Sequence, residues 1–334
     1  LPILGKSLKE VQDWAVRLSA GQWSDNDEAQ LWIRDDVYVT HQAIYAFLEE
    51  AKAQEKVVSW RAEGLVGGFV EEIALEDPTP MMIWSPTMSI WNDTWLQEAE
   101  TVEVEVTAHT ISMPAPQADM EYDVIQLPIT DAVVMPMRHW SQTLWANLLG
   151  LAPYLWRELV GHSPVQMILR LGWAYIRGWS KDPRILMRYL NRVGKNSFVH
   201  PSATVEASII GDNVTIGANA VVRGSVLRDN ARVEDLALVE GAIVSSGAVV
   251  QRQAMVKYAV LESDASVAGV VQLGVVGRNA SVKRGGYLMD MNFANGVRVS
   301  KNGTLIDAPL GLIGSCICSD TTVGLGVAIA AGRW

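Results

Sequence analysis

Residues 208–275 contain four consecutive blocks of equal length: SIIGDNVTIGANAVVRG from Ser208, SVLRDNARVEDLALVEG from Ser225, AIVSSGAVVQRQAMVKY from Ala242 and AVLESDASVAGVVQLGV from Ala259. Each block has 17 residues, and within a block the aliphatic positions are separated by steps of six, six and five. A fixed internal period of this kind predicts a repeat architecture. The three aliphatic rows are Ile210, Leu227, Val244 and Leu261; Ile216, Val233, Val250 and Val267; and Val222, Val239, Val256 and Leu273.

The spacing of these rows fits neither of the two common secondary-structure periods. A surface helix repeats its apolar residues about every 3.6 positions, and a strand with one buried face repeats them every two. One inward side chain every five or six residues instead suits a three-sided coil with a short strand on each side. Gly, Asn and Asp gather between the aliphatic positions, as in Gly211-Asp212-Asn213, where left-handed backbone conformations cost them little. Because each coil buries its row only by stacking on the next, we expect a solenoid with Ile216, Val233, Val250 and Val267 in one internal column.

Composition limits the classes of protein that the chain can represent. Its 334 residues are enough for two domains, and 49% of them are apolar, so a large core is available. The net charge of −10 argues against general nucleic-acid binding. Cys316 and Cys318 are too few for a zinc site or a disulfide framework and are expected to be core thiols, which favours a reducing, cytoplasmic setting. No uncharged run of 18 residues and no signal peptide is visible, so no transmembrane helix is expected.

Residues 1–137 alternate between helical and strand patterns. Residues 7–20 begin with a capping box, Ser7 and Glu10, and continue with a helical apolar face. Short strands are expected at residues 31–33, 57–60, 81–84, 102–106 and 129–135, and a helix after Thr40. This alternation predicts an α/β domain with a mostly parallel sheet.

Residues 138–195 form a predicted helical connector with an unusual charge. Nine Lys or Arg against Glu158 and Asp182 give +7 here, which leaves −17 for the other 276 residues. Helices are expected around Leu144 and over residues 154–160, 165–179 and 183–193. This basic, Trp-rich segment could lie on an anionic membrane, or it could pack on the solenoid and the first domain. The composition of the rest of the chain favours packing.

Residues 196–334 form the predicted solenoid domain. We expect the register to break after Val282, with a strand through Met289, Met291 and Phe293. A hairpin then follows around Lys301-Asn302-Gly303, within an insertion near 285–310. The coil resumes with Ile317, Val323 and Ile329, spaced by six.

The repeats resemble the hexapeptide-repeat, left-handed parallel β-helix, and Phe198-Val-His200-Pro-Ser-Ala-Thr-Val205 resembles the entry to such domains. The 17-residue block and the run from Asn302 to Arg333 resemble the C-terminal domains of bifunctional nucleotide-sugar pyrophosphorylases of the glucosamine-1-phosphate type. This resemblance implies a homo-oligomer, with a trimer favoured.

Three segments of the N-terminal half are similar to sugar-1-phosphate nucleotidyltransferases: Leu1-Pro-Ile-Leu-Gly-Lys-Ser-Leu, Ile33-Arg-Asp35-Asp36, and Thr143-Leu-Trp-Ala-Asn147-Leu-Leu. The resemblance implies a trimmed nucleotidyltransferase-like domain that joins an NTP to a sugar 1-phosphate. It implies that Asp35 and Asp36 bind Mg²⁺ and that Lys6 contacts a phosphate. It also implies that His139 and Asn147 line the same cleft. However, Arg138 lies where the family carries a second metal-binding aspartate, and no phosphate loop is visible. We therefore expect a degenerate form of the enzyme.

Two further hypotheses remain open at this stage. The first is a non-catalytic oligomeric scaffold or sensor that works through the solenoid. The second is a hexapeptide-repeat acyltransferase, which needs a histidine base. The five histidines are His41, His109, His139, His162 and His200, so none lies within residues 205–334, and only His200 is near the repeats. Sugar, nucleotide and partner are not specified by the sequence.

Overall fold

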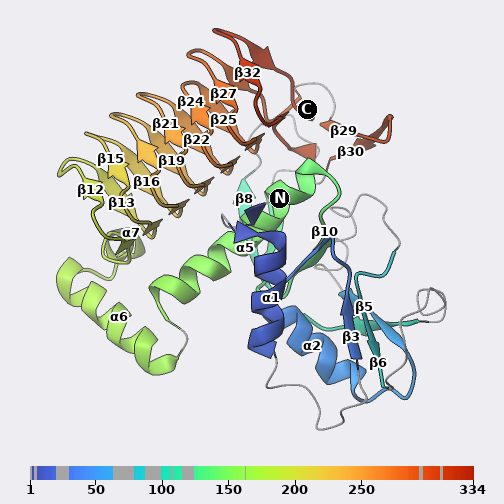
Figure 1. Cartoon of the computed structure of the whole chain (residues 1–334). Coiled ribbons are helices and arrows are strands. Elements are labelled where there is room, and N and C mark those ends of the chain that lie inside the picture. Colours follow the sequence, from blue (N-terminus) through green and yellow to red (C-terminus); the bar gives the residue numbers. More distant parts are fainter. Residues whose placement is uncertain are drawn as a thin grey trace. The chain divides into compact units, whose positions relative to one another are not determined.

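The computed structural model describes residues 2–3, 6–19, 30–62, 79–86, 99–106, 108–114, 124–161, 163–292, 296–308 and 311–334. The chain divides into two compact units, one formed mainly by residues 6–142 and the other mainly by 143–334 (Figure 1). The finer division at 137 and 195 stays a prediction. Among the described residues, no helix is both long and apolar enough to span a bilayer.

The described residues of the N-terminal unit form short strands and the helices α1 and α2. Its main sheet has the strand order β3-β6-β5-β7. Beside it, β4 pairs with β10 and β8 pairs with β9. The elements in chain order are β1 (Pro2–Ile3), β2 (Lys6–Ser7), α1 (Leu8–Ser19), β3 (Gln30–Ile33), β4 (Val37–Val39), α2 (His41–Ala51), β5 (Val58–Ala62), β6 (Met82–Ser85), β7 (Glu100–Val104), β8 (His109–Pro114), β9 (Val124–Ile129) and β10 (Val134–Pro136).

The prediction of a mostly parallel sheet is wrong. Strand β6 runs antiparallel to both β3 and β5, and only β5 and β7 are parallel. Hydrophobic patterns locate strands but do not say which strands pair, and β6 lies between two strands that precede it in sequence. Helix α2 covers this unit's core with its buried face, where Phe47 meets Trp60 edge to face at 6.1 Å.

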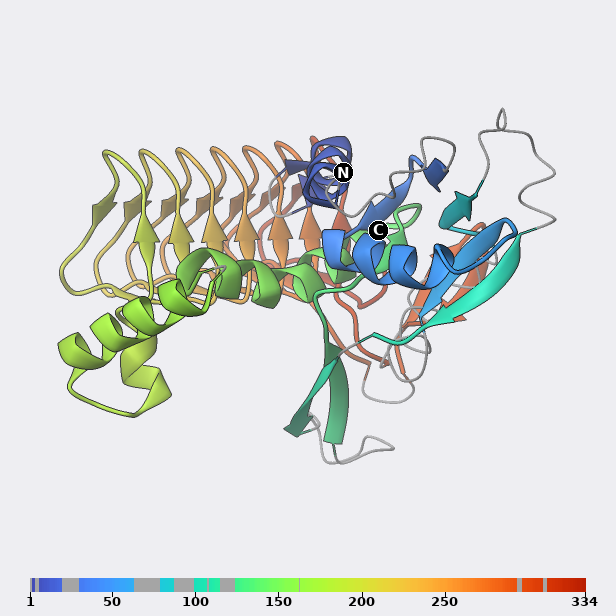
Figure 2. The same ribbon diagram turned by 90° about the horizontal axis from the view of Figure 1, so that it is seen from below.

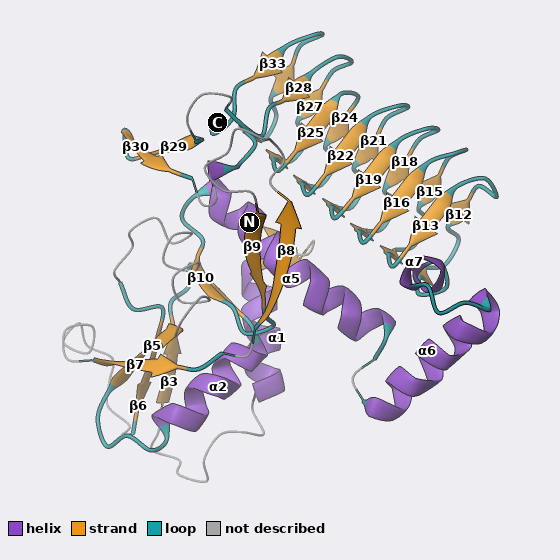
Figure 3. Cartoon of the chain, turned by 180° about the vertical axis from the view of Figure 1, so that it is seen from behind, coloured by secondary structure: helices purple, strands orange, loops and turns teal. Residues whose placement is uncertain are grey.

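The C-terminal unit is a left-handed parallel β-helix, as predicted. Three parallel sheets of seven strands form its sides (Figures 1 and 3). The first sheet contains β11 (Arg192–Val193), β14 (Ile209–Ile210), β17 (Val226–Leu227), β20 (Ile243–Val244), β23 (Val260–Leu261), β26 (Val275–Val276) and β31 (Cys316–Ile317). The second contains β12 (Phe198–Val199), β15 (Thr215–Ile216), β18 (Arg232–Val233), β21 (Val249–Val250), β24 (Ser266–Val267), β27 (Ser281–Val282) and β32 (Thr322–Val323). The third contains β13 (Thr204–Glu206), β16 (Val221–Arg223), β19 (Leu238–Glu240), β22 (Met255–Lys257), β25 (Val270–Gln272), β28 (Tyr287–Leu288) and β33 (Ala328–Ile329).

The predicted internal column is confirmed. Ile216, Val233, Val250 and Val267 pair in register from coil to coil, and all four are buried in one continuous core. The aliphatic rows of the first and third sheets are aligned in the same way. Apolar side chains stacked at the strand spacing of about 4.8 Å therefore fill the interior of the coil.

The fourth block departs from the predicted spacing. Val256 pairs with Val271, and Leu273 has a left-handed φ of 45° at a corner, so its assignment to the third row is wrong. The corner between β24 and β25 is two residues shorter than in the preceding coils. Gly269 permits this short corner, because a Cβ there would lie 2.0 Å from the Gly286 carbonyl oxygen. The equal block length in the sequence conceals this shift.

Aspartates join the corners of successive coils. The carboxylate of Asp212 accepts the backbone N–H of Lys195 at 2.6 Å, and that of Asp229 accepts the N–H of Asp212 at 2.8 Å. Asp235 accepts the N–H of Ala218 at 2.9 Å. Each bond spans one coil and satisfies a donor that the sheets leave unpaired. The aspartates of the repeat therefore have a structural role.

The interruption of the coil begins later than predicted. Leu288 still pairs with Val271, and no strand forms at Met289 to Asn292; Phe293 lies outside the described residues. The predicted hairpin is present as β29 (Arg298–Lys301) and β30 (Thr304–Asp307). Its turn has positive φ at both Asn302 and Gly303, as a two-residue hairpin turn requires. The coil then resumes at Ile317, Val323 and Ile329, as predicted.

Three helices precede the coil: α5 (Trp140–Leu159), α6 (Pro164–Gly178) and α7 (Pro183–Met187). Helix α5 continues through Pro153, and α7 ends early because residues 192–193 form the first coil strand. The part of α5 after residue 142 runs along the first sheet (Figure 2). Tyr154 lies under the Arg228 guanidinium at 5.8 Å, and Glu158 pairs with Arg192 at 2.5 Å. An outward aliphatic column of the first sheet is buried there: Ile209, Val226, Ile243, Val260 and Val275.

Candidate functional site

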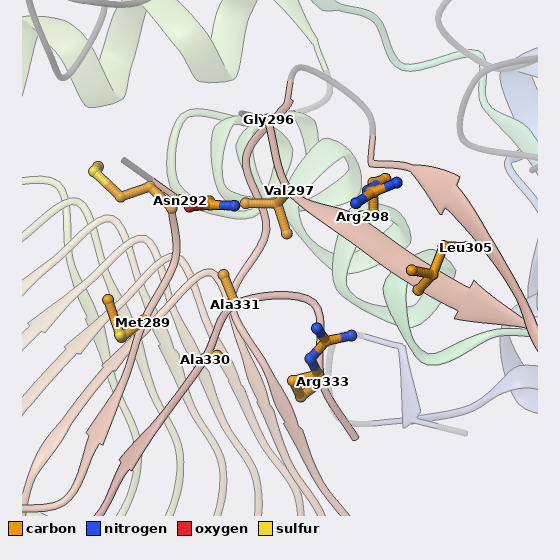
Figure 4. A pocket seen from close by; sticks show the side chains of 10 residues that line it. Met289, Asn292, Gly296, Val297, Arg298, Leu305, Ala330, Ala331 and Arg333 are labelled. Carbon is orange, nitrogen blue, oxygen red and sulfur yellow. The ribbon is translucent and has the colours of Figure 1, made fainter. Parts of the chain in front are cut away.

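A cavity of about 210 Å³ lies at the C-terminal end of the β-helix (Figure 4). Three segments form its wall: the residues after β28, both strands of the hairpin, and the last coil. They contribute Met289, Met291, Asn292, Gly296, Val297, Arg298, Leu305, Ala330, Ala331 and Arg333. The inserted hairpin thus brings residues from both sides of the interruption to one place.

Two backbone segments beside this cavity, at Gly332 and at Arg298, lie in close contact. Gly332 has a φ of 74°, and a Cβ there would lie 2.3 Å from the Arg298 carbonyl oxygen. Its N–H donates to the Gly314 carbonyl at 2.7 Å, and the N–H of Cys316 donates to the Arg333 carbonyl at 2.8 Å. Only a glycine permits this approach, so the C-terminal segment is fixed beside β29.

Two arginines give the cavity its charge. Figure 4 shows the Arg333 side chain reaching toward the space beside Val297 and β29, where Arg298 begins the strand. The described lining includes no carboxylate, and within the described residues neither guanidinium has an ion pair. A guanidinium offers five N–H donors that match phosphate and carboxylate oxygens. The cavity therefore suits an anionic group.

A second, more open cavity of about 500 Å³ lies beside the first coils, and several of its charged groups are already engaged. Arg192 pairs with Glu158, Arg228 lies over the Tyr154 ring, and Asp212 accepts the Lys195 N–H. A ligand would have to displace these contacts. The C-terminal cavity is the better candidate site.

The predicted metal ligand Asp36 is held by two arginines. Arg34 Nε lies 2.5 Å from its Oδ1, and Arg138 Nε contacts its Oδ2. Burial alone would raise the pKa of Asp36, but hydrogen bonds from Arg138 and Arg34 outweigh it and leave this pKa below its usual range. The described residues contain no group of three or more His, Cys, Asp or Glu arranged to hold a metal. Mg²⁺ binding by Asp35 and Asp36 stays a prediction, and it requires Arg34 and Arg138 to move.

The other predicted site residues have local roles in the structure. His139 lies at the start of α5, where its Nδ1 is 2.6 Å from Ser141 Oγ. Asn147 is fully buried in α5, and its Nδ2 donates to the Thr143 carbonyl at 2.8 Å. Lys6 belongs to β2, and its side chain lies outside the described residues. Their assignment to a catalytic cleft is a prediction that these local contacts do not test.

His200, the histidine closest to the repeats in sequence, is far from the C-terminal cavity. It follows the first strand of the second sheet, and its Nδ1 is 2.8 Å from Ser202 Oγ. Six strand spacings of about 4.8 Å separate the first and last coils, which places them roughly 29 Å apart. His200 therefore cannot act at the C-terminal cavity of the same protomer.

The prediction that both cysteines are core thiols is wrong. Cys316 is partly buried and Cys318 is exposed, because β31 ends at Ile317 and Cys318 lies at a corner. Both are free thiols. Burial, with smaller effects from Cys318 and Glu262, raises the pKa of Cys316 to about 12. A raised pKa keeps this thiol protonated at neutral pH, which makes it a poor nucleophile.

Sequence reasoning did not identify Arg298 and Arg333 as site residues. Arg298 begins the hairpin and Arg333 follows the last coil, so they are distant in sequence, and neither belongs to a short motif. The signal that points to them is the combination of a broken repeat, a hairpin turn and a resumed repeat. Such an insertion brings the ends of the interruption together at the edge of the last coil.

Comparisons with known proteins agree with the fold. A family model described as "Bacterial transferase hexapeptide (six repeats)" matches residues 192–224, and one described as "GlmU-like, C-terminal hexapeptide" matches residues 218–284. No curated protein matches significantly. Among solved structures, the polysialic acid O-acetyltransferase OatWY is similar over 42% of this chain and 71% of that chain, with 19% identity and a TM-score of 0.19. Similarity at this level supports no conclusion about activity.

Proposed function

We propose that the protein is a hexapeptide-repeat transferase of the acyl-transfer class, which binds an anionic group of its substrate or donor in the C-terminal cavity. The observation that carries the proposal is the presence of both Arg298 and Arg333 in a lining that includes no described carboxylate. The two matching family models, one of them a bacterial transferase model, support this class.

The cavity residues suit binding and orientation. The two guanidinium groups offer charge-assisted hydrogen bonds to a phosphate or carboxylate, and Ala330 and Ala331 leave room beside them. Met289 and Leu305 provide apolar contact for the rest of the ligand. None of the described lining residues is a histidine or a carboxylate, so the proton acceptor for acyl transfer lies outside this set.

Isothermal titration with coenzyme A, acetyl-coenzyme A and inorganic phosphate tests the proposal. The wild-type chain should bind an acyl donor, and Arg298→Gln with Arg333→Gln should weaken binding about tenfold or more, since each hydrogen bond to a charged group contributes roughly 1.5–3 kcal/mol. Arg232→Gln, an exposed arginine on the second sheet, is the matched control and should bind normally. Equal binding by the double variant, or no binding by the wild type, would contradict the proposal.

Nucleotidyl transfer is the second candidate function, and it rests on the resemblance of the segments around Asp35 and Asn147, since the GlmU-like match covers only the hexapeptide repeats at residues 218–284. It ranks lower because Asp36 is occupied by Arg34 and Arg138. Thermal unfolding with nucleoside triphosphates, sugar phosphates and Mg²⁺ distinguishes the two functions. A Mg²⁺-dependent stabilisation that Asp36→Asn abolishes would favour nucleotidyl transfer.

We also propose that copies of the chain associate through the third sheet. Helix α5 covers the first sheet, and the outward positions of the second sheet include Thr215, Arg232 and Ser266. The third sheet instead presents a half-buried apolar column, Val221, Leu238, Met255 and Val270. The charges beside this column pair within the chain: Arg223 with Glu206 at 2.9 Å and Lys257 with Glu240 at 3.0 Å. A trimer is the assembly that hexapeptide-repeat β-helices favour, and it fits one such face per subunit.

A further inference from the structure

Helix α6 presents an apolar face to solvent. Six large apolar side chains on and directly after the helix are more than half exposed: Val165 (66%), Ile168 (71%), Leu169 (67%), Trp173 (51%), Ile176 (68%) and Trp179 (86%). From Val165 to Ile176 their spacing follows the helical period, so they share one side of the helix. The opposite side carries Ala174, which is fully buried. Apolar patches of this kind on a protein surface mark interaction sites.

The helix is held in place mainly by contacts away from its exposed face, where the Trp173 ring meets Tyr189 edge to face at 6.4 Å. Ser163 caps the N-terminus, with its side chain accepting the N–H of Gln166, and Trp179 ends the helix in a left-handed conformation. Its inner side approaches α7, where a Cβ at Gly178 would lie 3.2 Å from Ile185. Figure 3 shows α6 extending outward with α7 beside it. The apolar face is therefore preformed, and a ligand need not order it.

The charged side chains of α6 are all positive. Arg170 and Arg177 lie along one margin of the apolar side, and Lys181 follows the helix; no acidic residue occurs between residues 159 and 181. Arg177 stacks over the Trp173 ring at 5.6 Å, and Arg170 donates to the Glu158 and Leu159 carbonyls at 2.8 Å. In a chain of net charge −10, this is a localised basic margin.

From the apolar face, its tryptophans and its basic margin, we propose that α6 docks on an anionic membrane surface. Arginine and lysine attract anionic headgroups, and tryptophan favours the membrane–water interface. A helix of 15 residues is about 22 Å long, too short to cross the hydrocarbon core, so it lies in the plane of the membrane. A second copy is the poorer occupant, because pairing two α6 faces brings their like-charged margins together.

Vesicle sedimentation of the full chain tests this proposal. The wild type should sediment with vesicles of phosphatidylcholine and phosphatidylserine, much less with phosphatidylcholine alone, and less as salt is raised. Ile168→Glu with Leu169→Glu should lower vesicle binding about tenfold or more. Each change replaces an apolar side chain that would enter the membrane with a negatively charged one. Arg177→Glu with Lys181→Glu should remove the preference for phosphatidylserine.

Controls separate membrane docking from other effects. Leu325, which is 77% exposed in the last coil, offers a matched variant, Leu325→Glu, that should bind vesicles like the wild type. Circular dichroism shows whether each variant is folded. Failure of the wild type to sediment with anionic vesicles would overturn the proposal, as would unchanged binding of the Ile168 and Leu169 variant. A smaller molecular mass of that variant by light scattering, without vesicle binding by the wild type, would show that the face joins copies of the chain instead.

Discussion

Gly269→Ala should destabilise the β-helix far more than its small size suggests. A Cβ at this position would lie 2.0 Å from the carbonyl oxygen of Gly286, and this oxygen accepts the N–H of Val270 at 2.9 Å. The Gly269 carbonyl itself accepts the N–H of Met255 at 3.0 Å. Because the clashing atom belongs to the backbone, relief of the clash must move the ladder on both sides of the shortened corner.

The magnitude follows from these contacts. Loss or distortion of two backbone hydrogen bonds contributes roughly 1–3 kcal/mol, and displacement of the packed column beside Val267 and Val271 adds to it, which gives about 2–4 kcal/mol in all. Urea unfolding followed by far-ultraviolet circular dichroism measures the change as a shift of the midpoint of the β-helix transition. The chain has two units, so this transition is analysed separately.

Gly324→Ala is the matched control, because the nearest atom to its new Cβ would be Val327 Cγ2 at an ordinary 3.6 Å. This variant should shift stability by no more than about 0.5 kcal/mol. Equal midpoints for the two variants would refute the inference that the fourth coil is shortened at Gly269.

Further outcomes follow from the same structure. Leu238→Glu with Met255→Glu should convert the oligomer to monomers by light scattering, because the third sheet supplies the proposed contact; an unchanged mass would exclude this face. Asp229→Ala should lower stability by about 0.5–1.5 kcal/mol in urea unfolding, since it replaces an exposed hydrogen bond to the Asp212 N–H with one to water. The lowered pKa of Asp36 means that its ionised form stabilises the fold. That contribution should be complete above the ordinary aspartate pKa of about 3.9 and be lost as the pH falls through the lower folded value. The stability difference between wild type and Asp36→Asn should therefore shrink in acid, and a difference independent of pH would contradict the ion-pair account.

Much of the β-helix could be predicted from the sequence because each coil repeats the same local rule. Inward aliphatic residues at fixed steps determined the column from Ile216 to Val267. The rule failed at Leu273, where two residues are missing from a corner and the block length no longer reveals the register. Sheet pairing in the N-terminal unit could not be predicted, because it depends on contacts between segments distant in sequence.

The candidate site could not be predicted from the sequence for the same reason. Arg298 and Arg333 line the same cavity only because the hairpin folds back on the last coil, and no spacing rule connects them. The connector shows a different limit of sequence analysis. The packing and membrane hypotheses were posed as alternatives for one segment, but its helices differ: α5 packs on the first sheet, whereas α6 exposes its apolar face.

The most direct test of the proposed function is an experimentally determined structure of the chain with acetyl-coenzyme A. Our account predicts density for an anionic group of the donor within hydrogen-bonding distance of the Arg298 and Arg333 guanidinium groups, at the cavity between the hairpin and the last coil. Density for the donor at another place, with both arginines facing solvent, would contradict it.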